Sequence, residues 1–276
     1  MTQRYLLKEI LGRGGMGAVY KAYDNETRRD VTLKTLLDVQ DRAMLDLFYR
    51  ECQVLATLNH PNIVDIYDVG EMEIDGSKRP YFVMPLLAGQ TLDRLIASAS
   101  HRLTPDAVVD MLSQAARGLH AAHERGLVHR DIKPSNIFVM DDDSVKIIDF
   151  GVAHLADGRT STTLKGTLHY MAPEQLQMQK PTALSDLFSL AVVAYQTFTR
   201  RRPFEGAAAD ETIQAILNRV PPPVSELNPA VSRAISQVVH KAMAKQPYHR
   251  FAHVREFGDC LQKALRGDPL DIFDDS

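Results

Sequence analysis

The chain has 276 residues, of which 45% are hydrophobic and 24% are charged, so it can bury a sizeable core in one large or two modest lobes. The formal charge of −3 and the short basic run at 200–202 exclude an extended nucleic-acid surface. Cys52 and Cys260 are too few for a disulfide framework and too far apart for a metal motif, which favours a reducing compartment. The longest apolar stretch, 187–198, is shorter than the ~18 residues of a membrane span, so no membrane segment is expected.

The first forty residues predict an antiparallel meander, with strands at 5–11, 18–23 and 31–36. The glycine-rich run at 12–17 joins the first two strands and also fits the dinucleotide-binding pattern G-x-G-x-x-G. That pattern requires a helix directly after the last glycine, whereas strand-like residues follow here. The sequence therefore argues against a Rossmann fold and leaves an ordinary glycine hairpin or a phosphate-binding loop.

A helical pattern runs from about residue 41 to residue 58, with its apolar residues on one stripe. Glu51 falls on that stripe. A carboxylate on an inward face is costly unless it is paired, so we expect this helix to aim Glu51 at a cation. Strands are predicted next at 63–69 and 81–84, followed by a connector at 85–89.

The remainder of the chain is mainly helical in pattern and ends in an acidic tail at 267–276, which we expect to be mobile. We therefore predict an α+β fold. In this fold a small antiparallel β-sheet lobe with one helix, 1–84, is joined to a larger helical lobe, 85–266, with a cleft between them. Helices are predicted at 92–99, 105–125, 184–199, 210–219, 230–244 and 254–266.

The stretch at 129–136 reads His-Arg-Asp-Ile-Lys-Pro-Ser-Asn, and Asp-Phe-Gly follows at 149–151. Two carboxylates with a lysine and an asparagine between them suit the handling of Mg²⁺ and phosphate beside an attacking hydroxyl. On these motifs the whole chain resembles a protein kinase catalytic domain, most like the eukaryotic-like serine/threonine kinases of bacteria. The resemblance implies the bilobal protein kinase fold.

The resemblance also implies an ATP site in the first lobe. Lys34 would grip the α- and β-phosphates, with Glu51 as its partner on the helix. Thr32 stands where the family nearly always has alanine, which predicts a raised KM for ATP. The ATP-binding residues expected from the resemblance are Leu11, Gly12, Gly14, Gly17, Val19, Thr32, Lys34, Met84, Pro85, Leu87 and Phe138.

The catalytic roles follow from the same resemblance. Asp131 would accept the proton of the substrate hydroxyl, and Lys133 would neutralise the transferring phosphoryl group. Asn136 and Asp149 would hold Mg²⁺, with Mn²⁺ as the alternative metal. Lys133 and Thr167 match the serine/threonine class of protein kinases rather than the tyrosine class.

Three further matches are expected to be structural. Glu174 and Arg250 resemble the buried ion pair of the helical lobe. Asp186 lies in the first turn of an almost wholly apolar helix, and in the family this residue anchors the backbone of the catalytic loop.

Regulation by phosphorylation is expected because Arg130 directly precedes the catalytic aspartate. The candidate phosphorylation sites are Thr163 first, then Thr162 and Thr160. His154 replaces the usual arginine or lysine in the same loop, which predicts a weaker and pH-sensitive grip on the phosphate.

The predicted function is thus transfer of the γ-phosphoryl group of ATP to serine or threonine hydroxyls of proteins, with autophosphorylation of the loop. A pseudokinase that binds nucleotide or partners without turnover is the alternative, and a small-molecule kinase is a third. The resemblance implies protein substrates, self-association for autophosphorylation in trans, and a partner with a forkhead-associated domain. It also implies a cytoplasmic location, either alone or as the cytosolic part of a longer membrane-anchored protein.

Overall fold

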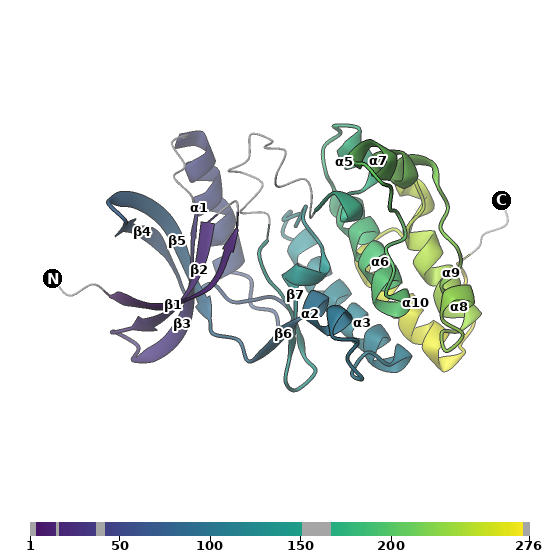
Figure 1. Cartoon of the computed structure of the whole chain (residues 1–276), viewed down its shortest axis with the longest axis horizontal. Coiled ribbons are helices and arrows are strands. Elements are labelled where there is room, and N and C mark those ends of the chain that lie inside the picture. The colour runs from purple at the N-terminus through teal and green to yellow at the C-terminus, as the bar shows by residue number, and fades with distance from the viewer. Residues whose placement is uncertain (1–3, 15–16, 37–41, 151–166, 273–276) are drawn as a thin grey trace.

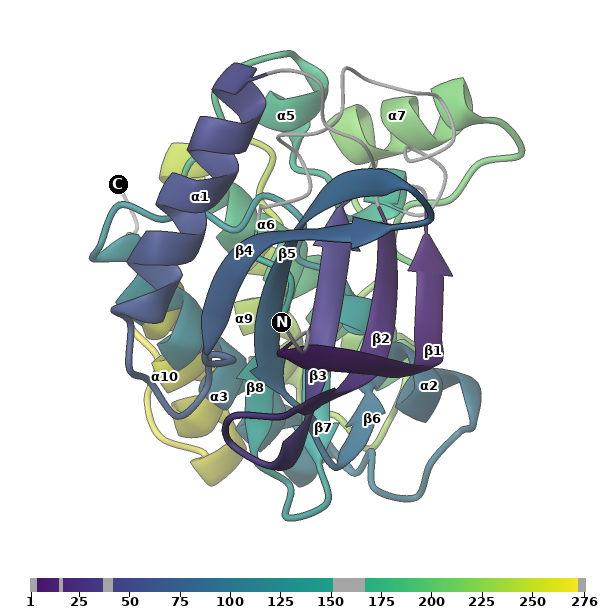
Figure 2. The same ribbon diagram turned by 90° about the vertical axis from the view of Figure 1, so that its left-hand side faces the viewer.

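The structure is a computed structural model that describes residues 4–14, 17–36, 42–150 and 167–272. Its N-terminal part is a twisted antiparallel sheet of five strands in the order β1-β2-β3-β5-β4 (Figures 1 and 2). The strands are β1 Tyr5–Gly14, β2 Gly17–Asp24, β3 Arg29–Leu36, β4 Asp68–Ile74 and β5 Ser77–Pro85.

The two faces of this sheet have different roles, because successive side chains of a strand point to opposite faces. Val31 and Leu33 of β3 are fully buried in a small apolar cluster on one face. Thr32 and Lys34 alternate with them and so point to the other face, toward the rest of the molecule. Met84 of β5 is in register with Thr32 and shares that face. The alternation therefore delivers Thr32 and Lys34 to the same side of the sheet.

A single long helix, α1 (Arg42–Ala56), lies beside this sheet (Figure 2). Phe48, Cys52 and Leu55 are buried on its inner side and belong to the main core. Glu51 is also buried, with 7% of its surface exposed. The predicted inward position of this carboxylate is thus confirmed.

The C-terminal part is helical, and its helices pack to the right of the small sheet in Figure 1. Its central helix, α6, is buried along almost its whole length and is surrounded by α3, α9 and α10. A side chain caps the N-terminus of α3, α6 and α9. The helices are α2 Leu92–Ala97, α3 Pro105–His123, α5 Pro173–Leu176, α6 Ala183–Thr199, α7 Ala209–Asn218, α8 Val224–Leu227, α9 Arg233–Ala242 and α10 Val254–Arg266. No helix in the described ranges is both long and apolar enough to cross a bilayer.

A second small sheet lies between the two parts and carries residues of the site. Its three antiparallel strands are β6 (Gly89–Thr91), β7 (Ile137–Met140) and β8 (Val145–Ile147), in that order. The predicted α+β architecture of two lobes is confirmed. The predicted boundary between residues 84 and 85 stays a prediction, although β5 ends at Pro85.

The strand predicted at 63–69 is wrong, because regular pairing in this region begins only at Asp68. Ile63 instead forms an isolated bridge to Ile147 of the second sheet. The side chain of Asn62 donates to the carbonyl of Val145 at 2.9 Å, and the Val64 amide donates to the carbonyl of Ile147 at 3.0 Å. These contacts attach the apolar run that begins at Ile63 to the C-terminal part. The run is hydrophobic because it packs between the two parts, and not because it is a strand of the sheet.

Candidate active site

The loop that carries the predicted catalytic residues is fixed by Asp186 of α6. Its carboxylate accepts the backbone N–H of His129 at 2.7 Å and that of Arg130 at 2.8 Å, and it also lies 2.8 Å from His123 Nε2. Asp186 is 1% exposed, so these charge-assisted hydrogen bonds form away from water. The predicted anchoring of the loop backbone by Asp186 is confirmed.

Gln175 of α5 fixes the same loop from the opposite side, and sequence reasoning missed it. Its side-chain oxygen accepts the N–H of Ala172 at 2.9 Å, and its Nε2 donates to the carbonyl of Arg130 at 3.2 Å. Arg130 has a φ of 68°, a left-handed conformation that costs a non-glycine residue of order 1 kcal/mol or more. Hydrogen bonds on both sides of the residue hold it in that conformation.

The predicted catalytic residues form one connected cluster. Lys133 Nζ donates to Asp131 Oδ2 at 2.8 Å and to Thr167 Oγ1 at 3.1 Å. Asn136 Nδ2 donates to the Asp131 carbonyl at 2.8 Å and to Asp131 Oδ2 at 3.2 Å. Asp131 Oδ1 is buried without a hydrogen-bond partner in the described part of the chain. One oxygen of this carboxylate is therefore oriented by Lys133 and Asn136, and the other has no partner among the described residues.

Lys34 and Glu51 are not paired with each other in this structure, and their pairing stays a prediction. Lys34 Nζ lies 2.6 Å from Asp149 Oδ1, while Glu51 Oε1 lies 3.6 Å from Arg130 Nη1. Asp149, with a φ of 60°, directs its carboxylate at Lys34 and so supplies the counter-ion that Glu51 was expected to provide. The buried Glu51 is paired with another cation, as its inward position requires.

The new partner satisfies Glu51 only in part. Burial raises the pKa of Glu51, and the positive charge of Arg130 opposes that rise. Glu51 Oε2 is buried and accepts no hydrogen bond from the described residues. An ion pair at 3.6 Å with one oxygen unsatisfied is a weak arrangement for a buried carboxylate.

The predicted ATP-binding residues are brought together where three strands run side by side. Val19 of β2 is in register with Lys34 of β3, and Thr32 of β3 is in register with Met84 of β5. Phe138 lies in β7 of the second sheet. The structure thus places Val19, Lys34, Thr32 and Met84 on adjoining strands of the first sheet and Phe138 in the second sheet, and the contact of these residues with ATP stays a prediction.

Packing requires glycine at Gly17 of β2 but does not require it at Gly12 of β1. Gly17 has a φ of 149°, and a Cβ there would lie 1.8 Å from the Thr35 carbonyl oxygen, so packing demands glycine. A Cβ on Gly12 would meet nothing within 4 Å, so packing in the protein does not explain that residue. Open space beside Gly12 suits a backbone that a ligand's phosphate must approach.

The residues present also fit a divalent cation. Asp149 supplies a carboxylate, and no hydrogen bond within the described ranges uses the side-chain oxygen of Asn136. Mg²⁺ is usually held by one or two such oxygen ligands together with substrate phosphates and water. No cluster of three or more histidine, cysteine, aspartate or glutamate side chains suited to a metal occurs in the described ranges. A metal ion at this site would therefore be coordinated by phosphate oxygens as well as by these protein oxygens.

The predicted ion pair of the helical lobe is present. Arg250 Nη1 and Nη2 donate to the two oxygens of Glu174 at 2.8 and 2.9 Å, which makes a bidentate pair. The Arg250 side chain is 0% exposed and that of Glu174 is 6% exposed. The predicted phosphorylation sites Thr160, Thr162 and Thr163, and His154, lie outside the described residues.

Comparison with known proteins agrees with this geometry. A family model described as "Protein kinase domain" matches residues 5–263. The serine/threonine-protein kinase PknB of Mycobacterium tuberculosis is 36% identical over 276 residues, which cover 98% of this chain and 44% of PknB. The serine/threonine-protein kinase Pkn1 of Myxococcus xanthus is 40% identical over 274 residues, which cover 95% of this chain and 38% of Pkn1.

The fold agrees with solved structures as well. The crystal structure of the M. tuberculosis PknI kinase domain matches with a TM-score of 0.74 and 26% identity, over 95% of this chain and 96% of that one. The chain spans less than half the length of the curated relatives it matches. On the family match and these similarities, the chain belongs to the protein kinase domain family.

Proposed function

We propose that this chain transfers the γ-phosphoryl group of ATP to serine and threonine hydroxyls of proteins. One observation carries the proposal: Asp131 has one carboxylate oxygen held by Lys133 and Asn136 and the other without a partner among the described residues. An oriented carboxylate with a free oxygen is what a base needs to accept the proton of an attacking hydroxyl. The names of PknB and Pkn1 support serine and threonine as acceptors.

The other side chains of the cluster act on charge and position. The ammonium group of Lys133 lies between the carboxylate of Asp131 and the hydroxyl of Thr167, where it would balance negative charge on the transferring group. Asn136 and Asp149 would hold Mg²⁺, or Mn²⁺ in its place, and the metal when bound would neutralise phosphate charge. The family implies ATP and a divalent metal; the choice of Mg²⁺ is part of this proposal.

The ion pairs correspond to a resting arrangement of the site. Active protein kinases need the pair between the strand lysine and the helix glutamate together with the metal-binding aspartate. Lys34 and Glu51 each have a different partner here. We propose that autophosphorylation at Thr163, with Thr162 and Thr160 as further sites, favours the active pairing, and that His154 makes this step pH-sensitive.

The first test is incorporation of labelled phosphate. The purified chain with Mg²⁺ and labelled ATP should become labelled and should label a protein substrate, and an Asp131→Asn variant should not. Absence of label on both the chain and the substrate would overturn the proposal in favour of a pseudokinase. Label on a small metabolite alone would indicate a small-molecule kinase.

The partners of the whole protein are a further proposal. Protein substrates follow from the proposed reaction. Self-association for autophosphorylation in trans, a partner with a forkhead-associated domain and a cytoplasmic location rest on the resemblance alone. Mixing active chain with a tagged Asp131→Asn chain tests the first of these, because label on the tagged chain requires transfer between molecules.

A further inference from the structure

Helix α10 begins at a histidine that packs against a second histidine, on α3. The rings of His253 and His120 have their centres 5.0 Å apart and are inclined to each other by 40°. His253 is the residue before the first turn of α10, and His120 lies in the last turn of α3. Two side chains of the type that takes up a proton near neutrality therefore meet where these helices come together.

The ring of His253 caps α10. Its Nδ1 accepts the N–H of Glu256 at 3.1 Å, and the backbone carbonyl of His253 accepts the same N–H at 3.1 Å. A ring nitrogen accepts a hydrogen bond only while it carries no proton, so this cap requires a neutral His253. A proton on Nδ1 would leave two donors facing each other and would add positive charge at the positive end of the helix dipole.

The ring of His120 is disfavoured as a cation in its packed position. Its side chain is 21% exposed, and burial lowers its pKa from the ordinary value of 6.5. The carboxylate of Glu124, 3.8 Å from His120 Nε2, opposes this shift, whereas positive charge on His253, Arg255 or His123 adds to it. Just below pH 6.5 a detached ring therefore binds more protons than the packed ring, so acid favours detachment.

The acidic side chains of α10 near His253 already have partners. The carboxylate of Glu256 accepts the N–H of Ala252 at 3.0 Å, and the carboxylate of Asp259 lies 3.8 Å from Arg255. Neither is therefore free to act as the counter-ion of a protonated ring. The other charged residues that line the same surface pocket as His253 are two cations and one acid, Lys263, Arg266 and Asp271.

The middle of α10 is held to α3 by contacts that do not titrate. A Cβ on Gly258 would lie only 2.9 Å from the Cβ of Ala116, so the two helices approach closely there. Ser113 Oγ also donates to the carbonyl of Gly258 at 3.1 Å. We propose that His120 and His253 form an acid-sensitive contact, whose protonation releases the first turn of α10 from α3. The contacts at Gly258 confine the release to that turn.

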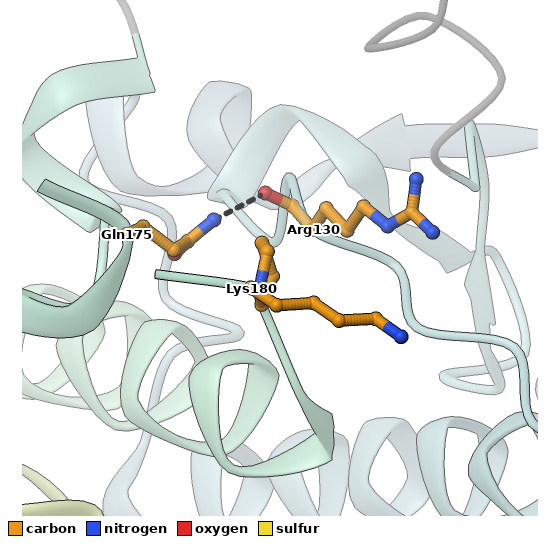
Figure 3. Close-up of a pocket in the computed structure, with 4 residues that line it drawn as sticks. Arg130, Gln175 and Lys180 are labelled. Atoms are coloured by element: carbon orange, nitrogen blue, oxygen red, sulfur yellow. Dashed lines mark hydrogen bonds between the residues drawn. The ribbon is translucent and has the colours of Figure 1, made fainter. Parts of the chain in front are cut away.

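The catalytic loop provides an internal reference, because residues outside α10 hold it. The N–H of Arg130 donates to Asp186 at 2.8 Å, and Gln175 donates to the carbonyl of Arg130 at 3.2 Å (Figure 3). Release of the first turn of α10 should leave both hydrogen bonds in place. The inference does not rest on the proposed function, since none of its steps involves phosphoryl transfer.

Hydrogen exchange followed by NMR at pH 7.5 and pH 5.5 tests the release. After correction for intrinsic exchange, protection of the Glu256 N–H should fall about fivefold on acidification, as expected for loss of a helix cap. Protection of the Arg130 N–H should not change. In His253→Asn the protection of Glu256 should stay constant, because asparagine caps helices well and does not titrate. His101→Asn, at an exposed histidine outside both helices, should behave as the wild type.

Titration of the histidine rings by NMR tests the coupling of the pair. The pKa of His120 should lie below 6.5 in the wild type and should rise in His253→Asn, because a neighbouring positive charge is gone. The proposal requires both results. It is overturned if protection of Glu256 has the same pH dependence in His253→Asn and the wild type, or if Arg130 loses protection in parallel. A pKa of His120 that His253→Asn leaves unchanged also overturns it.

Discussion

Arg130 and Glu51 meet between the catalytic loop and α1, with Nη1 of the arginine 3.6 Å from Oε1 of the glutamate. The contact joins the residue before the proposed catalytic aspartate, Asp131, to the helix of the other lobe. Glu51 is thus paired with Arg130 and not with Lys34, whose ammonium group lies 2.6 Å from Asp149 Oδ1. One arginine thus holds the carboxylate that an active kinase needs elsewhere.

Removing the charge of Arg130 should release Glu51. We expect phosphatase-treated Arg130→Gln to be up to about fivefold more active than the phosphatase-treated wild type, because a partly exposed pair is worth up to about 1 kcal/mol. Phosphorylation should then activate the variant less than the wild type, since the guanidinium group that would receive the phosphate is gone. The measurement is kcat/KM for a protein substrate before and after phosphorylation.

Arg94→Gln provides the matched control, because Arg94 is an exposed arginine of α2. It should leave both activities at the wild-type values. If Arg130→Gln and the wild type show the same ratio of phosphorylated to unphosphorylated activity, Arg130 does not control the position of Glu51.

Gln175 should act on catalysis through position alone. Gln175→Met keeps the length of the side chain and loses the hydrogen bonds to Ala172 and Arg130. We expect kcat to fall about tenfold while KM for ATP is unchanged, because the left-handed Arg130 next to the catalytic aspartate loses one of its two restraints. The exposed Gln177, changed to methionine, is the control. An equal loss of kcat in both variants would mean that general destabilisation of α5 is the cause.

The Glu51 result shows what a sequence can and cannot predict about such a site. Its place on an apolar helical stripe correctly predicted an inward carboxylate that needs a cation. A periodic pattern shows which face of a helix a residue lies on, but it does not show which residue will contact it. It could not tell whether Lys34 or Arg130 would pair with Glu51. Which cation is nearest depends on how α1 sits against the catalytic loop, and that is a property of packing between the lobes.

Other differences have equally local causes. The catalytic residues could be predicted because several polar residue types occur together in one order. Gln175 is a single common residue whose role depends on a contact made by the fold. The apolar run that begins at Ile63 fitted a strand because hydrophobicity alone does not tell a sheet strand from a segment packed between lobes. The strands of the second sheet have three or four residues each, too few for a period to be recognised.

Thr32 is predicted to weaken ATP binding through bulk. It is 5% exposed, in register with Met84, and on the same face of β3 as Lys34. If the adenine base packs on this face, Thr32→Ala should lower KM for ATP by up to about fivefold, which corresponds to about 1 kcal/mol of steric relief. Val31→Ala, on the opposite face, should reduce stability without that gain. An unchanged or higher KM in Thr32→Ala would refute the role of this residue.

Removing one partner of the buried Glu174–Arg250 pair should destabilise the fold more than removing both. Burial disfavours the charged form of Glu174, but hydrogen bonds from Arg250 outweigh it and lower the pKa of this carboxyl. Its contribution to stability is therefore present above the ordinary pKa of 4.5 and lost as pH falls through the folded-state value. Arg250→Met should reduce the free energy of unfolding by about 3–5 kcal/mol at pH 7.

A double variant separates the pair from its surroundings. Glu174→Gln combined with Arg250→Met leaves no unpaired buried charge, so it should be more stable than Arg250→Met alone. Urea unfolding of the wild type, both single variants and the double variant completes the cycle. Strict additivity of the two single effects would show that the two side chains are not coupled.

Lys245 should make stability depend on pH in the alkaline range. Its ammonium group donates to the carbonyl of Ile216 and lies 4.0 Å from the centre of the Phe204 ring. Burial lowers its pKa from 10.5 to about 8, and the positive charges of Arg219 and Arg250 act in the same direction. Between about pH 8 and 10.5 the unfolded chain therefore holds a proton that the folded chain has lost, so the folded state gains stability as pH rises through this window.

The prediction concerns the difference between the wild type and Lys245→Met, because other groups that titrate in both chains then cancel. The free energy of unfolding of the wild type, relative to the variant, should increase between pH 8 and pH 10 and stay constant between pH 6 and pH 7. Urea unfolding at each pH measures it, and Lys78→Met, at an exposed lysine of β5, should show no such change. A wild-type advantage that is flat from pH 6 to pH 10 would mean that Lys245 keeps its proton in the folded chain, held by the Ile216 carbonyl and the Phe204 ring.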